Sequence, residues 1–82
     1  MIFTEHALQQ ISLRHIKIIW IKRILSRPYL QKSHSIDDEL SIIYGWITEE
    51  SKWLKIIVKF LHHDVVIITA HFDRNFKGIV NK

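Results

Sequence analysis

Residues 53–72 constrain the fold more than any other stretch of this sequence. Here the polar break His62-His63-Asp64 separates two runs rich in β-branched residues, WLKIIVKFL and VVIITAHF. Two such runs around a short break are typical of an antiparallel β-hairpin. Because the chain has only 82 residues, the remaining elements must pack against this hairpin.

Side-chain alternation predicts the register of the hairpin. A strand has a period of two, so one strand should present Leu54, Ile56, Val58 and Phe60 on its inner face, and the other Val66, Ile68, Ala70 and Phe72. The two sets share a face if Leu54 pairs with Phe72 and Phe60 pairs with Val66. On the outer face, this register places Lys55 opposite His71, Ile57 opposite Thr69 and Lys59 opposite Ile67. We therefore expect polar chemistry on the face turned away from the core.

Two helices are predicted before the hairpin. Thr4 is suited to be the N-cap of a helix over residues 5–12. Residues 16–26 combine apolar side chains at helical spacing with a basic outer side, and Pro28 cannot continue that helix. The basic side is typical of a solvated helix surface, and contact with nucleic acid is the alternative.

Strands are expected at residues 29–34, 40–48, 52–61 and 64–72, with an acidic loop at 35–39 and a polar tail at 73–82. Gly45, inside the second of these strands, indicates a bulge or a close approach of another backbone. Helices that precede a run of strands are typical of the α+β class. We predict a single domain over residues 1–82, with both helices on one face of a four-stranded antiparallel sheet.

Composition limits the chemistry. The chain has no cysteine, so disulfides, zinc-thiolate sites and thiol nucleophiles are excluded. Six histidines include no pair at the i, i+4 spacing of a helical zinc motif, and we predict no metal and no cofactor. A formal charge of +4 favours anionic partners. No apolar run approaches the roughly 18 to 20 residues of a membrane span, and no signal peptide is apparent, so we expect a cytoplasmic protein without membrane contact.

The remaining candidates are His, Arg and Lys side chains that can surround a phosphodiester. Metal-free RNA cleavage needs a base for the 2′-hydroxyl, an acid for the leaving oxygen, and fixed positive charge for the phosphorane. Histidine can be base or acid near neutral pH, and arginine stays charged. His6 and Arg14 flank the first predicted helix, whereas His71 and Arg74 end the last strand. A histidine in a first helical turn is more often a surface or capping residue, which is the alternative for His6.

The segments FTEHALQQISLRHIKIIWIKRILSRP, IIYGWI, KWLKIIVKF and VVIITAHF together resemble a family of small bacterial and phage proteins grouped as a domain of unknown function. The matching residues are Thr4, His6, Ala7, Arg14, Ile16, Pro28, Tyr44, Gly45 and Thr69. The departures are Gln10 in place of an arginine, His15 in place of a glycine, Lys17 in place of a capping Ser or Thr, and His71 in place of an aromatic residue. This family resembles the BrnT toxins and, more distantly, the RelE-type ribonucleases.

The resemblance implies a metal-independent endoribonuclease toxin that cleaves single-stranded RNA by attack of the 2′-hydroxyl. Its catalytic residues would be His6 and His71 for proton transfer, with Arg14 and Arg74 for phosphate stabilisation. Its RNA contacts would be Lys55 and Lys59 to the backbone, with Tyr44, Trp53 and Trp46 near the bases. Edge packing is the alternative for the two tryptophans. The implied partners are RNA and an antitoxin protein.

Two other classes stay open. A non-catalytic module of the same fold that binds protein or nucleic acid is suggested by Gln10, where an arginine is usual. A homo-oligomeric subunit is the other. The ribonuclease assignment requires His6, Arg14, His71 and Arg74 to lie within reach of one phosphate. That arrangement needs the first helix to pack beside the end of the last strand.

Overall fold

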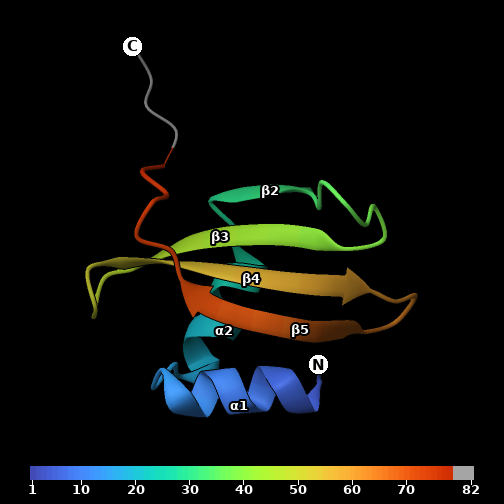
Figure 1. The fold of residues 1–82 in the computed structure, drawn as a ribbon, viewed down its shortest axis with the longest axis horizontal. Helices are drawn as coiled ribbons and strands as arrows, with labels where there is room; N and C mark the ends of the chain where they lie inside the picture. The colour runs from blue at the N-terminus through green and yellow to red at the C-terminus, as the bar shows by residue number, and fades with distance from the viewer. Residues whose placement is uncertain (79–82) are drawn as a thin grey trace.

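A five-stranded mixed sheet with two helices forms the protein in the computed structural model, which describes residues 1–78 (Figure 1). The elements in chain order are β1 (Ile2–Phe3), α1 (Glu5–Leu13), α2 (Ile18–Ser26), β2 (Leu30–Ser33), β3 (Ser41–Ile47), β4 (Lys52–Phe60) and β5 (Val65–Phe72). The strands lie in the order β1-β5-β4-β3-β2. The predicted α+β class with two leading helices is confirmed.

The prediction of four antiparallel strands was wrong, because β1 adds a fifth strand. β1 pairs in parallel with β5, with Ile2 opposite Val66 and Phe3 opposite Ile67. Two residues are too few to produce a strand-like alternation, so the sequence pattern could not reveal this element.

Thr4 makes the transition from β1 to α1. Its amide donates to the carbonyl of Ile67 at 3.1 Å, and its hydroxyl donates to the carbonyl of Ile68 at 3.0 Å. The same hydroxyl accepts a hydrogen bond from the amide of Ala7 at 3.0 Å, which confirms the predicted N-cap. As a result, β1 pairs with only the first part of β5, and α1 runs beside the remainder in the same direction (Figure 1).

A β-bulge in β5 changes half of the predicted hairpin register. The pairs Leu54–Phe72, Lys55–His71 and Ile57–Thr69 are confirmed. The next β4 residue, Val58, faces Ile67, which leaves Ile68 without a partner on β4. This extra residue is the one whose carbonyl bonds the Thr4 hydroxyl.

Beyond the bulge, every predicted pair is displaced by one residue. Phe60 faces Val65 instead of Val66, and Lys59 faces Val66 instead of Ile67, so both predicted pairs were wrong. Ile67 consequently enters the core, whereas Phe60 is 50% exposed. The four apolar residues 65–68 fit either face, so their alternation alone could not fix the register.

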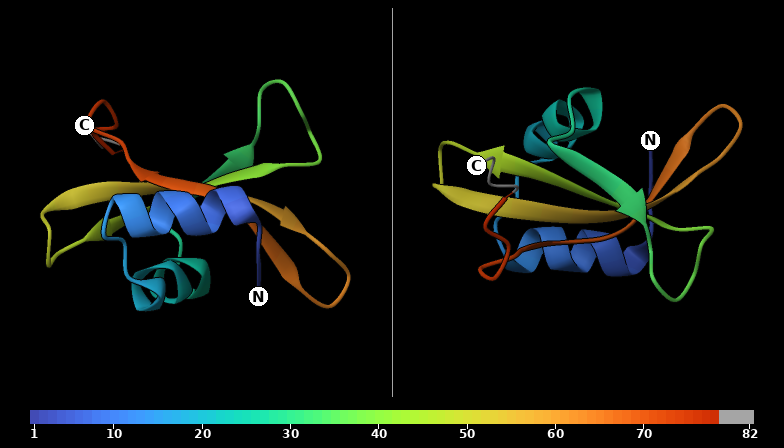
Figure 2. Two further views of the ribbon diagram at one scale, coloured as in Figure 1. Left: turned by 60° about the horizontal axis from the view of Figure 1, so that its bottom comes forward. Right: turned by 90° about the horizontal axis from the view of Figure 1, so that it is seen from above.

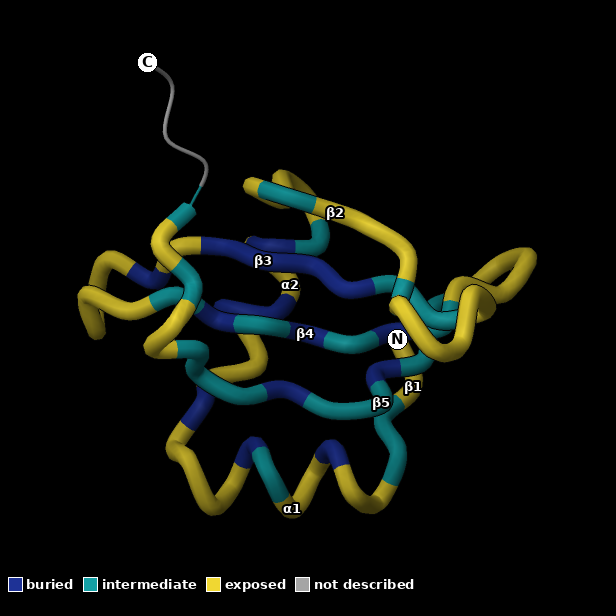
Figure 3. Tube along the Cα trace, turned by 45° about the horizontal axis from the view of Figure 1, so that its top comes forward, coloured by how far each residue is buried: buried dark blue, intermediate teal, exposed yellow. Residues whose placement is uncertain are grey.

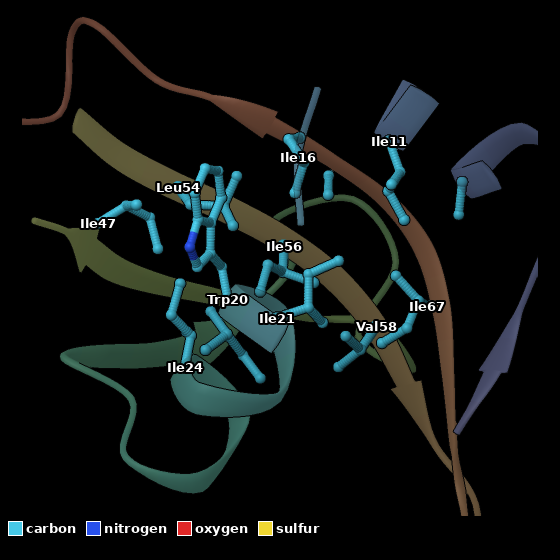
Figure 4. Packing of buried hydrophobic residues seen from close by; sticks show 13 residues of the cluster. Ile11, Ile16, Trp20, Ile21, Ile24, Ile47, Leu54, Ile56, Val58 and Ile67 are labelled. Atoms are coloured by element: carbon cyan, nitrogen blue, oxygen red, sulfur yellow. The ribbon is translucent and has the colours of Figure 1, made fainter. Parts of the chain in front are cut away.

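Both helices lie next to the sheet (Figure 2), and one apolar cluster joins them to it (Figure 4). Its fully buried side chains include Ile21 from α2, Leu54 and Ile56 from β4, and Ile67 from β5. The inner side of α1 is buried toward β5, and the outer turns are exposed (Figure 3). Among residues 1–78, neither helix is long and apolar enough to cross a membrane.

Gly45 allows α2 to approach β3 closely, which was one of the two predicted explanations for this glycine. A Cβ atom at this position would overlap the side chain of Ile24, with the Cδ1 atom 2.7 Å away. The other explanation, a bulge, is not what β3 shows, because Gly45 pairs regularly with Leu54.

The connection between the helices is a tight turn. Arg14 is the C-cap of α1, and His15 adopts a left-handed conformation with a φ of 57°. This is the position where glycine commonly ends a helix. Ile16 is buried, and α2 starts at Ile18 rather than at residue 16.

Residues 73–78, the described part of the predicted polar tail, form no helix or strand and fold back onto the sheet. The amide of Asp73 donates to the carbonyl of Trp53 at 2.9 Å, and Phe76 packs on aromatic side chains of β3 and β4. The predicted tail also included residues 79–82, which lie outside the described residues.

We expect replacement of Thr4 by valine, which has a similar shape, to lower the free energy of unfolding by about 2 kcal/mol. The substitution removes the N-cap and leaves the Ile68 carbonyl without this donor. Thr4→Ser keeps the hydroxyl and is the matched control. Urea denaturation monitored by circular dichroism measures both variants. Equal stabilities of the valine and serine variants would contradict the role assigned to the hydroxyl.

Candidate functional site

Polar side chains form a row across the outer face of the sheet, which is the face turned away from α2 (Figure 1). Tyr44 of β3 lies opposite Lys55 of β4, and Lys55 lies opposite His71 of β5. Asp73, just after β5, completes the row by accepting a hydrogen bond from the Tyr44 hydroxyl at 3.0 Å. We call Tyr44, Lys55, His71 and Asp73 the polar row.

Arg14 adds a second cation at the His71 end of the polar row. Because α1 runs parallel to β5, the end of the helix lies beside the end of the strand (Figure 1). The charge of Arg14 is close enough to contribute to lowering the pKa of His71. The Nε atom of Arg14 also donates to Oε1 of Gln10 at 2.9 Å. The structure thus brings together two of the four predicted catalytic residues.

His71 is half-buried, and its surroundings disfavour the charged imidazolium. Burial lowers the pKa of His71 below its ordinary 6.5, and the positive charges of Lys55 and Arg14 lower it further, while Asp73 acts in the opposite direction. The imidazole is therefore neutral at pH 7. A neutral imidazole beside two cations can accept a proton from a hydroxyl group of an anionic substrate, while the cations hold the anion in place.

Asp73 is a charged member of the row that the sequence did not suggest. Burial alone would raise the pKa of its carboxyl, but hydrogen bonds from the Asn75 amide, the Tyr44 hydroxyl and the Phe76 amide, together with the charge of Lys55, lower the pKa overall. Its Oδ1 atom accepts from the two amides at 3.0 and 3.2 Å. An aspartate two residues before an asparagine, as in Asp73-Arg74-Asn75, is compatible with such a turn, and this was the available signal.

His6 and Arg74, the other two predicted catalytic residues, are both exposed. His6 is exposed in the first turn of α1, just over two helical turns before Arg14, or about 12 Å along the helix axis. Arg74 is exposed and lines a cavity that the two residues after His71 also line. His6 and Arg14 therefore lie far apart along α1, whereas Arg14 and His71 lie close enough to interact electrostatically.

The predicted RNA-contacting aromatic residues belong to a packed cluster. Phe76 stacks on Tyr44 with ring centroids 3.8 Å apart, and it meets Trp53 edge to face at 5.0 Å. Tyr44 is only 5% exposed, so its ring is covered in this conformation. Trp46 contacts Trp53 at 5.2 Å and is 44% exposed, which leaves it the more accessible of the two tryptophans.

The two predicted backbone-contacting lysines differ in their surroundings. Lys55 is half-buried within the polar row. Lys59 lies nearer the other end of β4, where its Nζ atom is 3.3 Å from Oε1 of Glu39 in the acidic loop. This ion pair offsets part of the positive charge of Lys59, so Lys55 is the better placed to act with Arg14.

A cavity of about 360 Å³ adjoins the polar row near the β3–β4 turn. Its lining residues are Trp46, Ser51, Lys52, Trp53, Phe72, Asp73, Arg74, Phe76 and Lys77. Three of these residues are cationic, and four are aromatic. Among residues 1–78, no group of three or more His, Cys, Asp or Glu side chains is arranged to hold a metal ion.

The fold and this face define a small α+β domain whose outer sheet surface combines a neutral histidine with cations and aromatic rings. The sequence pattern of a domain of unknown function, DUF4258, matches residues 3–72. The chain therefore belongs to the DUF4258 family, which confirms the part of the predicted resemblance that concerns a small domain of unknown function. No curated protein and no solved structure matches the chain.

The Tyr44–Asp73 hydrogen bond gives a testable dependence of stability on pH. Burial, followed by the bond to Asp73, raises the pKa of Tyr44 to about 12 from its ordinary 10.0. The unfolded chain thus loses this proton first, and the free energy of unfolding should fall as pH rises from about 10 toward 12. Urea denaturation across this range measures the effect. Tyr44→Phe should remove that part of the decline, and a variant that keeps the full slope would contradict the assignment.

Proposed function

We propose that this protein is a metal-independent endoribonuclease that cleaves single-stranded RNA, with Arg14 and the polar row as its active site. The observation that carries the proposal is the position of His71, half-buried between Arg14 of α1 and Lys55 of β4. One proton acceptor with a cation on each side supplies two of the three requirements of metal-free phosphodiester cleavage.

The reaction begins at the ribose 2′-hydroxyl. His71 accepts its proton, and the 2′-oxygen attacks the adjacent phosphorus atom. Arg14 and Lys55 stabilise the negative charge of the phosphorane. The bond to the 5′-oxygen then breaks, and this oxygen takes a proton from the Lys55 ammonium. The products are a 2′,3′-cyclic phosphate and a 5′-hydroxyl, after which solvent restores both proton states.

Lys55 replaces His6 as the proposed acid because of its position. It lies directly opposite His71 in the sheet, whereas His6 is about 12 Å from Arg14 along α1. Asp73 holds the Tyr44 hydroxyl, whose raised pKa makes it a poor proton donor at neutral pH. Lys55 is thus the member of the row best suited to protonate the leaving group.

The biological role that we propose is that of a cytoplasmic toxin related to the BrnT and RelE-type ribonucleases and inhibited by an antitoxin protein. β2 ends the sheet and pairs only with β3. Its other edge can accept a strand from a partner. An antitoxin that adds a strand there could extend across the outer face toward the polar row.

Cleavage of a labelled single-stranded RNA in EDTA tests the proposal. We expect 2′,3′-cyclic phosphate ends, and no cleavage at a nucleotide that lacks its 2′-hydroxyl. His71→Ala and Lys55→Ala should each lower kcat/KM by 10² or more, on the order of a lost acid or base. His63→Ala, at the exposed β4–β5 turn, is the matched control and should retain full activity.

His6→Ala distinguishes the two assignments of the acid. Activity within about threefold of the wild type supports Lys55, because a residue remote from the reacting atoms has no proton to contribute. A loss equal to that of His71→Ala would return His6 to the active site. Intact RNA after incubation with concentrated wild-type protein would contradict the ribonuclease proposal altogether.

A second candidate function is RNA binding without cleavage. Gln10 stands where the resemblance predicts an arginine, and its side chain accepts a hydrogen bond from Arg14. The site therefore has one cation fewer than the pattern predicts. This alternative expects RNA affinity that decreases with salt while the RNA stays intact.

A further inference from the structure

We infer that the cavity near the β3–β4 turn is a nucleotide subsite, where a base of single-stranded RNA packs on Trp46 and its phosphates lie near Lys52, Arg74 and Lys77. The inference deepens the proposed function, because it takes RNA as the ligand and assigns a place to a nucleotide beyond the cleaved bond. It concerns binding alone, and so it can hold or fail separately from cleavage.

The aromatic side chains leave space for a base. Trp46 and Phe76 both meet Trp53 edge to face, with interplanar angles of 67° and 83°. The three rings therefore form walls rather than one closed stack. With Trp46 44% exposed and a cavity volume of about 360 Å³, the site lies within the typical size range of small-ligand pockets. Base stacking on an accessible aromatic ring tolerates any base.

The charges around the cavity favour an anion. Within residues 1–78, no carboxylate forms an ion pair with Lys52, Arg74 or Lys77. The Lys52 ammonium instead lies 5.0 Å from the ring centroid of Phe72. These uncompensated cations produce a positive potential at a concave site.

Asp73 is the acidic residue in the lining, and three cationic residues outnumber its single negative charge. Its Oδ2 atom accepts from the Tyr44 hydroxyl, and its Oδ1 atom accepts from the amides of Asn75 and Phe76. Both carboxylate oxygens are thus occupied by donors from the protein. Donors on the rim of the cavity remain available to a phosphate.

The cavity is contiguous with the proposed active site. Phe72 and Asp73 follow His71 directly in the chain, and both line the cavity. Asp73 belongs to the polar row as well. A strand whose phosphate lies between Arg14 and His71 can therefore place a neighbouring nucleotide in the cavity. An acidic peptide would use the cations but would leave Trp46 unused, so the aromatic wall favours a nucleotide.

Binding of a six-nucleotide RNA with 2′-O-methyl groups, which cannot be cleaved by 2′-hydroxyl attack, tests this inference. Fluorescence anisotropy of the labelled strand is measured across a range of salt concentrations. Trp46→Ala should weaken binding about tenfold, on the scale of one lost base stack. Trp46→Phe, which keeps a ring, should show a smaller loss and guards against misfolding of the alanine variant.

Charge removal provides the second arm. Arg74→Gln and Lys77→Gln should each weaken binding and reduce the slope of log affinity against log salt by about 0.7, as expected for one lost phosphate contact on a single strand. Lys22→Gln makes the same charge change on the outer side of α2, where the residue is exposed. This matched control should bind like the wild type.

Four outcomes would overturn the subsite. Two are that the wild type shows no binding at low salt, or that Trp46→Ala binds RNA as tightly as the wild type. The other two are that Trp46→Ala loses as much affinity for an abasic strand of the same charge as for RNA, or that hexaglutamate displaces the RNA as efficiently as unlabelled RNA does. If wild-type protein cleaves RNA but Trp46→Ala binds normally, the subsite fails and the ribonuclease proposal stands. If Trp46→Ala loses affinity while wild-type protein never cleaves RNA, the ribonuclease proposal fails and the subsite stands.

Discussion

Three hydrogen bonds at Thr4 determine how the two halves of this small domain meet. The Thr4 amide bonds the carbonyl of Ile67, and its hydroxyl connects the amide of Ala7 to the carbonyl of Ile68. One residue thereby ends the parallel strand, caps α1 and bonds the bulged position of β5. Because α1 starts there and runs with β5, its other end lies beside the end of that strand (Figure 1). The proximity of Arg14 to His71 follows from a contact at the opposite end of the helix.

The sheet divides the molecule into an apolar side and a mixed side. On one side, α2 packs on the sheet while α1 runs along its β5 edge, and both helices contribute to a core rich in isoleucine (Figure 1). The other face has aromatic rings at the β3–β4 turn and polar groups across the centre, and residues 73–78 pack over part of it. The backbone of β4 supplies both faces, because Leu54 and Ile56 alternate with Trp53 and Lys55. Side chains of the buried core and of the candidate site thus come from the same strand.

The features that local pattern determines were predictable from the sequence. Thr4 as a cap, Gly45 as a point of close approach, and Lys55 opposite His71 all follow from short-range rules. β1 was not predictable, because two residues have no usable period. The bulge at Ile68 lies in a run that is apolar on both faces, so local alternation could not reveal it, and the contact with Thr4 lies far away in the sequence.

The candidate site was predictable only in part, for a geometric reason. Arg14 and His71 meet because each ends its element and the two elements run in the same direction. His6 belongs to the start of α1, so the same geometry separates it from His71. Asp73 and Phe76 were missed because a single carboxylate and a single ring in a polar segment have no periodicity. Their place depends on long-range contacts with Tyr44 and Trp53.

The central claim is that docking of α1 along β5 places the Arg14 cation beside a partly buried, neutral His71. Titration of the His71 imidazole by NMR, in the wild type and in Arg14→Gln, tests this claim most directly. We predict a His71 pKa below 6.5 in the wild type and a higher pKa in the variant, because one of the charges that lower the pKa has been removed. A wild-type pKa at or above 6.5, unchanged in Arg14→Gln, would contradict it.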